Sequence, residues 1–286
     1  MNNVKYFLGM LLVACCFSAY SQLKEFTAKG IEREIVKVND TLCAFRCETS
    51  NLEYNTFLHI IEKSDTGLYK KCQIDSLRWL ETGNNQELVR HYHRHPGFND
   101  YPVVCLSYDA AIAYCKWLTD VYNSDKDRKY KKIVFVLPSG QEWELAATGN
   151  KKNIVYPWGT NSLRDTRKGS WQGVFLANFK RVGEGSIVGD INGNPVYKEM
   201  VIETDLDDRS FDDRSFYTSP VRSFFPNSLG IYNQSGNAAE MTIQKGLTKG
   251  GSWNSFGGEI AISDKLYFNE PSPEVGFRVF MKIIEK

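Results

Sequence analysis

The sequence predicts a single, loop-rich α+β domain. Three observations support this fold class: apolar and polar side chains alternate over residues 31 to 48, three segments before residue 149 have helical periodicity, and that periodicity disappears afterwards. The chain has 286 residues, 42% of them hydrophobic, which is enough apolar material for a sizeable core. No Pro- or Ser-rich linker divides residues 22–286, so one domain is the simplest account.

The first part of the chain shows strand and helix patterns in turn. Residues 31 to 48 alternate apolar and polar side chains, as strands do. Thr49-Ser50-Asn51, all good capping residues, then precede apolar positions at helical spacing, so a capped helix is expected there. Another helix is expected after Ser107, with apolar side chains recurring as far as Leu118. Either Ser107 or Asp109 can cap it.

A short strand and a short helix follow. Ile133 to Leu137 is rich in β-forming residues and is stopped by Pro138. Ser139 stands at the N-cap position of a third helix, which is expected to run to Ala147. Glu142 occupies the position at which a capping box places its glutamate.

The second half of the chain differs in composition from the first. From residue 149 onward Gly, Asn, Pro, Ser and Asp become frequent, which predicts loops and short strands. An acidic insertion is expected near 187–218, and it contains the tandem repeat Asp207–Phe211 and Asp212–Phe216. The charge pattern favours an exposed, solvated loop over a functional tail.

Residues 1–21 are typical of an export signal. The apolar run Tyr6 to Ala14 is too short to span a bilayer, and no later segment has the length of a transmembrane span. Cleavage after Ala19-Tyr20-Ser21 is the favoured processing. The stretch Leu12 to Cys15 resembles a lipobox, so a lipid anchor at Cys15 stays open as an alternative. We therefore expect an exported protein, in the periplasm, on the outer-membrane surface or secreted.

Charge and cysteine content limit the possible partners and cross-links. The formal net charge of +1 provides no field that would steer nucleic acid or an anionic membrane, so no nucleic-acid partner is expected. An exported protein can form disulfides, and the cysteines beyond the signal are Cys43, Cys47, Cys72, Cys105 and Cys115. Because their number is odd, at least one thiol stays free or pairs between chains. Cys105 and Cys115 lie in apolar contexts that favour core packing.

Three histidines alternate along the chain at His91, His93 and His95. On a strand they would share one face, and imidazole nitrogen suits zinc or copper. No cysteine or carboxylate stands near them at a standard ligand spacing, which favours surface or loop histidines over a metal site.

Several short motifs then occur in a characteristic order. They are Tyr101–Val104, Ala113–Leu118, Leu137–Ala147, Tyr156–Gly159, Ala177–Phe179, Pro220–Phe224, Gly230–Asn233, Gly236–Ala238, Gly250–Trp253 and Gly276–Val279. The ordered set resembles the formylglycine-generating enzyme (sulfatase-modifying factor) family over residues 35 to 282. This resemblance implies a loop-rich, C-type-lectin-like α+β fold. Residues 75–100 are also similar to gliding-motility lipoproteins of gram-negative bacteria, envelope proteins that use the fold structurally.

The two cysteines that would bind copper, as the resemblance implies, are absent from this sequence. Enzymes of this family oxidise a peptide cysteine to formylglycine, with copper bound by two cysteines shortly after the Gly-Gly-Ser motif. Thiolates are the ligands that Cu(I) requires. Here Ser255 and Ile260 stand at those two positions, and no cysteine follows Cys115. The resemblance therefore implies a non-catalytic member without copper. The alternative is a copper-dependent oxidoreductase for sulfatase maturation with a rearranged site.

A calcium segment of the family is retained. The family holds a structural calcium in an N-x-x-G-x-A-x-E segment, and the matching positions are Asn233, Gly236, Ala238 and Glu240. Carboxylate, amide and carbonyl oxygens are what Ca²⁺ prefers. The family's second calcium uses residues that correspond to Asn178 and Phe179, with Asp190 as a candidate later ligand. The rival interpretation of the first segment is a Gly-Asn turn with an exposed glutamate.

These features together predict a structural or binding module of the bacterial cell envelope, with an envelope protein or peptide as partner. Sugar binding, a further candidate, depends on analogy with lectin-like folds alone. Arg278 matches an arginine of the family near the C-terminus. A buried structural ion pair is expected there in preference to an anion site.

Overall fold

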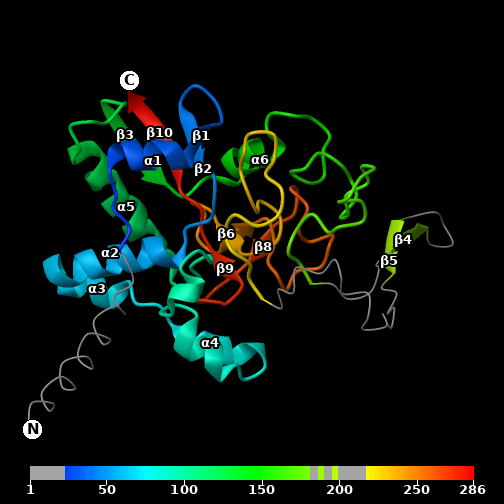
Figure 1. Ribbon diagram of the computed structural model, residues 1–286, viewed down its shortest axis with the longest axis horizontal. Coiled ribbons are helices and arrows are strands. Elements are labelled where there is room, and N and C mark those ends of the chain that lie inside the picture. Colours follow the sequence, from blue (N-terminus) through cyan, green and yellow to red (C-terminus); the bar gives the residue numbers. More distant parts are fainter. Residues whose placement is uncertain (1–22, 181–185, 190–194, 199–216) are drawn as a thin grey trace, which may run out of the picture.

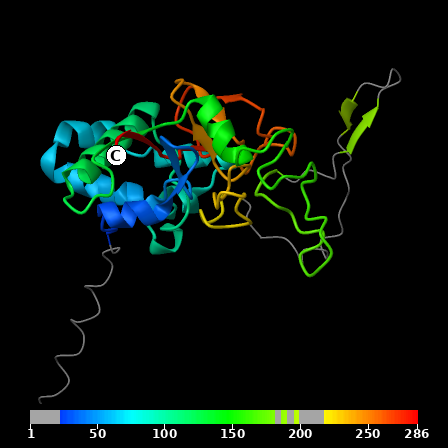
Figure 2. The same ribbon diagram turned by 90° about the horizontal axis from the view of Figure 1, so that it is seen from above.

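The computed structural model describes residues 23–180, 186–189, 195–198 and 217–286, and within them the protein is a mixed α+β fold. The expected export signal and the acidic tandem repeat lie outside the described residues. Figure 1 shows helices gathered on one side of the fold and loops on the other. Figure 2 shows the same division from above, with residues 150–180 away from the helices near the N-terminal end.

The first sheet joins the two ends of the chain. Its strands are β1 (Ile35–Lys37), β2 (Leu42–Phe45), β10 (Phe280–Glu285) and β3 (Lys132–Val136). They are antiparallel in the order β1-β2-β10-β3, so the last strand of the chain lies between two early ones (Figure 1). This arrangement makes the sheet dependent on contacts that are distant in sequence.

The prediction of strands over residues 31 to 48 is wrong at its start. Residues Ala28–Glu34 form the helix α1, because Thr27 caps it by accepting a hydrogen bond from the Gly30 amide at 3.1 Å. The prediction is confirmed for β1 and β2. All four residues of β2 are buried, since helices and loops cover both faces of this strand.

The three predicted helices are confirmed. They are α2 (Asn51–Ser64), α5 (Tyr108–Ser124) and α6 (Gly140–Thr148). Ser50, Ser107 and Ser139 are their N-caps, so Ser107 rather than Asp109 caps α5. The Ser139 hydroxyl accepts from the Glu142 amide at 3.2 Å, and the Glu142 carboxylate accepts from the Ser139 amide at 2.8 Å. This reciprocal pair is the expected capping box.

Residues 66–98 contain short helices that periodicity does not reveal, because one or two turns give too few apolar repeats. They are α3 (Thr66–Lys71), α4 (Gln86–His91) and the 3₁₀ segments Ser76–Thr82 and Pro96–Phe98. Trp79 is fully buried in this region and packs against Tyr92, with ring centroids 4.6 Å apart. An aromatic cluster therefore organises a stretch with little regular structure.

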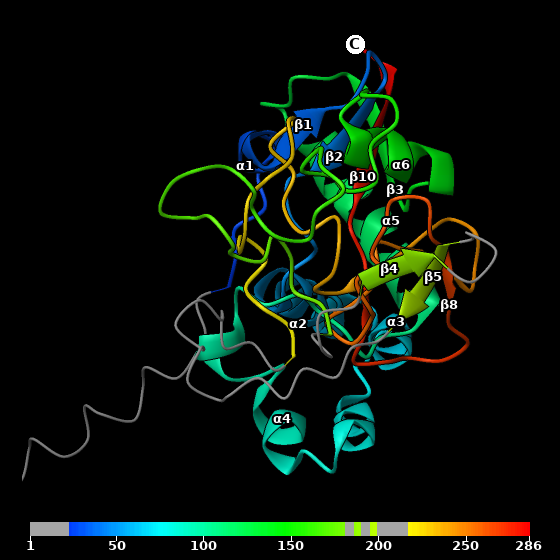
Figure 3. The same cartoon turned by 90° about the vertical axis from the view of Figure 1, so that its right-hand side faces the viewer.

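The second half of the chain is loop-rich, as expected, with short strands. One sheet has the order β8-β7-β6-β9, formed by β8 (Leu266–Tyr267), β7 (Leu247–Lys249), β6 (Ala239–Met241) and β9 (Val275–Gly276). β6 and β9 are parallel, and the other pairs are antiparallel. Within the expected acidic insertion, β4 (Ser186–Gly189) and β5 (Pro195–Lys198) pair with each other. Figure 3 shows the loops of this half from the side.

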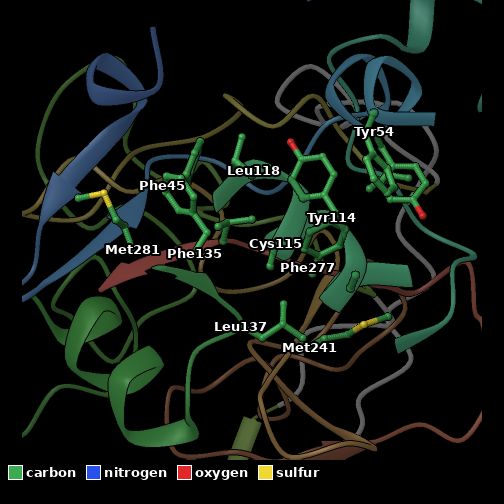
Figure 4. Packing of buried hydrophobic residues seen from close by; sticks show 14 of the residues in the cluster. Phe45, Tyr54, Tyr114, Cys115, Leu118, Phe135, Leu137, Met241, Phe277 and Met281 are labelled. Carbon is green, nitrogen blue, oxygen red and sulfur yellow. The ribbon is translucent and has the colours of Figure 1, made fainter. Parts of the chain in front are cut away.

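The largest core cluster lies between α5, the first sheet and α2. Figure 4 shows Tyr114 and Cys115 of α5 close to Phe135 and Phe277. Tyr114 contacts Phe277 with ring centroids 5.4 Å apart and Tyr54 at 5.9 Å. Burial of these large rings supplies a major part of the folding free energy, at about 25 cal/mol per Å² of apolar surface.

The backbone of Gly236 packs directly against Asn178. Gly236 has φ +76°, and a Cβ added there would lie 2.0 Å from the Asn178 carbonyl oxygen. Gly236→Ala should therefore lower the free energy of unfolding by about 2 kcal/mol or more, from strain and displacement of backbone. Gly258→Ala is the control, because nothing lies within 4 Å of its added Cβ. Urea titration of both variants measures the difference, and equal stability would contradict this packing.

Candidate functional site

The two positions that correspond to the copper ligands are both buried and occupied by other interactions. Ser255 is 4% exposed, and its hydroxyl accepts a hydrogen bond from the Ser252 amide at 3.0 Å. Ile260 is 0% exposed and packs in an apolar cluster with Tyr156 and Phe179. A hydroxyl and an aliphatic side chain provide neither thiolate that Cu(I) needs.

The Gly-Gly turn before these residues fits Ile260 closely. Gly251 has φ +68°, and a Cβ there would lie 2.7 Å from Cγ2 of Ile260. The Ser235 hydroxyl donates to the Ile260 carbonyl oxygen at 2.7 Å. The isoleucine is thus an integrated part of the fold, packed against the turn that precedes the family's catalytic segment.

The predicted calcium residues are brought together only in part. The Asn178 carbonyl oxygen accepts from the Asn237 amide at 2.8 Å, so the segments around Asn178 and Gly236 lie side by side. Phe179 is buried in the apolar cluster around Ile260. Asp190 lies outside the described residues. The structure therefore joins the two candidate segments without testing the second calcium set.

A buried carboxylate that the sequence did not single out lies next to the first segment. Glu48 is 1% exposed, and its two oxygens accept from Asn233 Nδ2 at 3.1 Å and Asn237 Nδ2 at 2.9 Å. The Ala238 amide also donates to it at 3.3 Å. Burial raises the pKa of Glu48 to about 8, although the positive charge of Arg278 opposes that shift. Its sequence signal is weak, an acidic residue three positions after the end of the apolar strand β2.

A buried carboxyl group is one of the ligand types that Ca²⁺ prefers. The groups that contact Glu48 are N–H donors, namely Asn233 Nδ2, Asn237 Nδ2 and the Ala238 amide. In the described ranges, no three side chains of His, Cys, Asp or Glu form a group that could hold a metal. A cation here would therefore depend on amide and carbonyl oxygens beside Glu48.

Glu240 takes part in a buried ion pair with Arg278, which confirms that this arginine forms a buried ion pair and identifies its partner. Arg278 Nε and Nη2 lie 3.0 and 2.6 Å from Glu240 Oε1, and Trp143 Nε1 donates to Oε2 at 2.7 Å. Burial lowers the pKa of Arg278, but the charge of Glu240 outweighs this effect and raises it. Glu240 is also buried, not exposed on a turn. Its role as a calcium ligand stays a prediction.

Arg278 also connects distant backbone segments. Its Nη1 donates to the Phe45 carbonyl of β2 at 3.1 Å, and Nη2 donates to the Tyr232 carbonyl at 2.7 Å. Together with Glu240 of β6 and Trp143 of α6, one guanidinium group bridges both sheets and a helix. This is a network in which every charged atom has a partner.

The three histidines do not share one face. His93 is 4% exposed; Trp79 Nε1 donates to its Nε2 at 3.3 Å, and its Nδ1 contacts Asn51 Oδ1 at 3.0 Å. Burial lowers its pKa to about 3. His91 and His95 are exposed, and His95 Nδ1 accepts from the Gly97 amide. The prediction of surface or loop histidines is confirmed for His91, at the end of α4, and for His95, whereas His93 is a neutral core residue.

In the described part of the chain Cys43, Cys47, Cys72, Cys105 and Cys115 are free thiols. Cys105 and Cys115 are buried in the core, as expected. Burial raises the pKa of Cys47 to about 12 and that of Cys72 to about 11, so these thiols stay protonated near neutral pH. Within the described part of the chain, no helix has the length and apolar character that crossing a bilayer requires.

Removal of Arg278 tests the buried network. Arg278→Ala leaves Glu240 buried without its ion-pair partner, so we expect a loss of about 3–5 kcal/mol in the free energy of unfolding. Lys245→Ala, which breaks an exposed pair with Asp109, should change it by less than about 0.5 kcal/mol. Denaturant unfolding measures both values, and a similar small loss in both variants would refute a dependence on the Arg278 network.

His93 predicts a dependence of stability on pH. Its pKa in the folded state, about 3, is below the unfolded value of 6.5, so protons favour the unfolded state. Its contribution, on the order of 3–5 kcal/mol, is complete above about pH 6.5 and is lost as pH falls toward 3. His93→Gln should flatten this part of the pH profile, whereas His91→Gln should leave it unchanged. The free energy of unfolding, measured by denaturant titration between about pH 3 and pH 6.5, tests this prediction. If His93→Gln has the same pH profile as the unaltered protein, His93 does not cause the pH dependence.

Known proteins with similar sequences share this domain. The model of the sulfatase-modifying factor enzyme 1-like domain matches residues 25–283. The inactive C-alpha-formylglycine-generating enzyme 2 of Bos taurus is 30% identical over 147 residues, covering 51% of this chain and 34% of that protein. The formylglycine-generating enzyme of Thermomonospora curvata is 30% identical over 144 residues, covering 49% and 32%. The chain thus spans about a third of the length of these relatives.

A longer match is the protein named chaperone protein LppX of Paenibacillus barcinonensis. It is 24% identical over 247 residues, covering 73% of this chain and 78% of that protein. Among solved structures, CarF is similar with a TM-score of 0.48 and 18% identity, covering 87% of this chain and 93% of CarF. Because the family model extends over nearly the whole described chain, the chain belongs to the sulfatase-modifying factor enzyme 1-like family.

Proposed function

We propose that this protein is a non-catalytic, C-type-lectin-like binding module of the bacterial cell envelope. The observation that carries the proposal is the state of the copper positions, where Ser255 is hydrogen-bonded and Ile260 is packed in a core. The scaffold around them is intact, including the Arg278–Glu240 pair. A family member that keeps the fold and replaces both thiolates keeps the means to bind without the means to oxidise.

Two further observations favour a binding role. One similar protein is named inactive, and another is named a chaperone protein. The first residues of the sequence resemble an export signal, with Cys15 as an alternative site for a lipid anchor. An exported protein or peptide of the envelope is the partner that suits these features.

A direct assay distinguishes this function from sulfatase maturation. The purified protein, supplied with Cu(I), reductant and dissolved oxygen as the oxidant, should leave the cysteine of a CxPxR peptide unchanged, whereas a catalytic formylglycine-generating enzyme converts it. The physical reason is that neither Ser255 nor Ile260 can bind Cu(I). Mass spectrometry of the peptide measures the conversion. Turnover of the peptide by this protein would establish the oxidoreductase alternative.

We further propose that calcium braces the module at Glu48 and the segment from Asn233 to Glu240. Calcium would supply charge compensation to the buried Glu48 carboxylate and would bind through oxygen ligands. The proposal extends to the segment at Asn178 and Phe179 with Asp190 for a second ion. Support comes from the close packing of Asn178 against Gly236 and from the absence of a cationic side chain among the hydrogen-bond partners found for Glu48 in the described residues.

Glu48→Gln tests the calcium proposal. Added calcium should raise the melting temperature of the unaltered protein, because a ligand that binds only the folded state stabilises it. At a free concentration 100 times Kd the gain is about 2.7 kcal/mol. Glu48→Gln should abolish the shift, while Glu62→Gln, on the exposed side of α2, should retain it. A calcium response that persists in Glu48→Gln would remove Glu48 from the site.

A further inference from the structure

A tight loop projects from the loop-rich side of the molecule, within the segment of residues 150–180 shown in Figures 1 and 2. The Asp165 amide donates to the Val174 carbonyl at 2.8 Å, and the Gly173 amide donates to the Asp165 carbonyl at 2.8 Å. These two bonds close the base of the loop. These hydrogen bonds give the loop of residues 166–172 a defined conformation.

The tip of this loop carries an unusual combination of side chains. Trp171 is 59% exposed and meets Phe225 edge to face, with ring centroids 5.7 Å apart. The Arg167 guanidinium lies over the same Phe225 ring at 5.8 Å. Lys168, also exposed, stands between them in sequence. We refer to Arg167, Lys168, Trp171 and Phe225 as the Trp171 patch.

Arg167 is oriented by a buried acid. Asp165 is 5% exposed, and its carboxylate accepts from Arg167 Nε at 3.0 Å and Nη2 at 2.6 Å. The Arg167 side chain is nevertheless 74% exposed. The remaining N–H groups of a fixed guanidinium are therefore available to an acceptor, with little side-chain entropy left to lose on binding.

The loop stands on the core cluster that contains Ile260. Leu163, just before the loop, packs in that cluster, and the Leu176 amide donates to the Leu163 carbonyl at 2.9 Å. The apolar residue at the second copper position thus supports the base from which the Trp171 patch projects. The cluster that contains Ile260, where the family has a copper-binding cysteine, is therefore also the cluster against which the base of this loop packs.

We propose that the Trp171 patch binds a peptide segment of a partner protein that presents a carboxylate beside an apolar or aromatic side chain. Tryptophan and arginine dominate the binding energy of protein interfaces, and an exposed tryptophan beside an arginine held in place by Asp165 matches such a segment. This inference rests on the proposed function as a binding module. It adds the place of binding and the chemistry of the partner.

A defined peptide library tests the proposal. The purified protein is used to select binders from a phage-displayed library of random peptides, and selected peptides are then synthesised and titrated by fluorescence anisotropy. We expect the selected sequences to share an acidic residue near an apolar or aromatic one. Trp171→Ala and Lys168→Glu should each weaken binding about tenfold or more. Arg167→Gln, whose amide can still donate to Asp165, should weaken it as well.

The control is Tyr267→Ala, which removes an aromatic side chain that is 73% exposed on β8 and should leave affinity unchanged. Circular dichroism confirms that each variant is folded. Selected peptides that lack acidic residues, or equal affinity in Trp171→Ala and the unaltered protein, would overturn the proposal. So would Trp171-dependent binding of heparin without binding of any peptide, which would assign the patch to an anionic glycan. If peptide binding fails while the CxPxR peptide stays unoxidised, only the patch assignment falls. Oxidation of the CxPxR peptide would overturn the proposed function itself, whatever the peptides do.

Discussion

The buried pair of Arg278 and Glu240 is the interaction on which the arrangement of the other elements depends. Both side chains are almost completely removed from water, where an unpaired charge would be strongly destabilising. Arg278 is satisfied only if β6 supplies Glu240 and β2 supplies the Phe45 carbonyl. Glu240 in turn takes its remaining bond from Trp143 of α6. The two sheets and α6 must therefore assemble together for any of these groups to be paired.

The packing of this chain does not depend on thiols at positions 255 and 260. The Arg278 network and the polar cluster around Glu48 and Asn237 maintain a loop-rich architecture whose regular strands are short. Ser255 and Ile260 are incorporated by a hydrogen bond and by apolar packing. Both residues are therefore part of the packed framework that carries the loops.

Local signals in the sequence predicted local structure well. Ser50, Ser107 and Ser139 each mark a helix start, because an N-cap acts within its own turn. Contacts between residues distant in the sequence could not be predicted from it in the same way. The burial of His93 depends on Trp79 and Asn51, which come from other segments, and no spacing rule reveals them. Glu48 likewise gains its surroundings from residues some 185 positions away. The ion pair of Arg278 was foreseeable only through the family resemblance, since nothing local identifies Glu240 as its partner.

The most direct measurement is elemental analysis of the purified protein by mass spectrometry after exchange into metal-free buffer. A non-catalytic, calcium-braced module should retain calcium in a stoichiometric amount and contain no copper, because buried carboxylate and amide oxygens prefer calcium and no thiolate pair is present. Stoichiometric copper in the protein would contradict the account, since it would require a thiolate site that Ser255 and Ile260 cannot form.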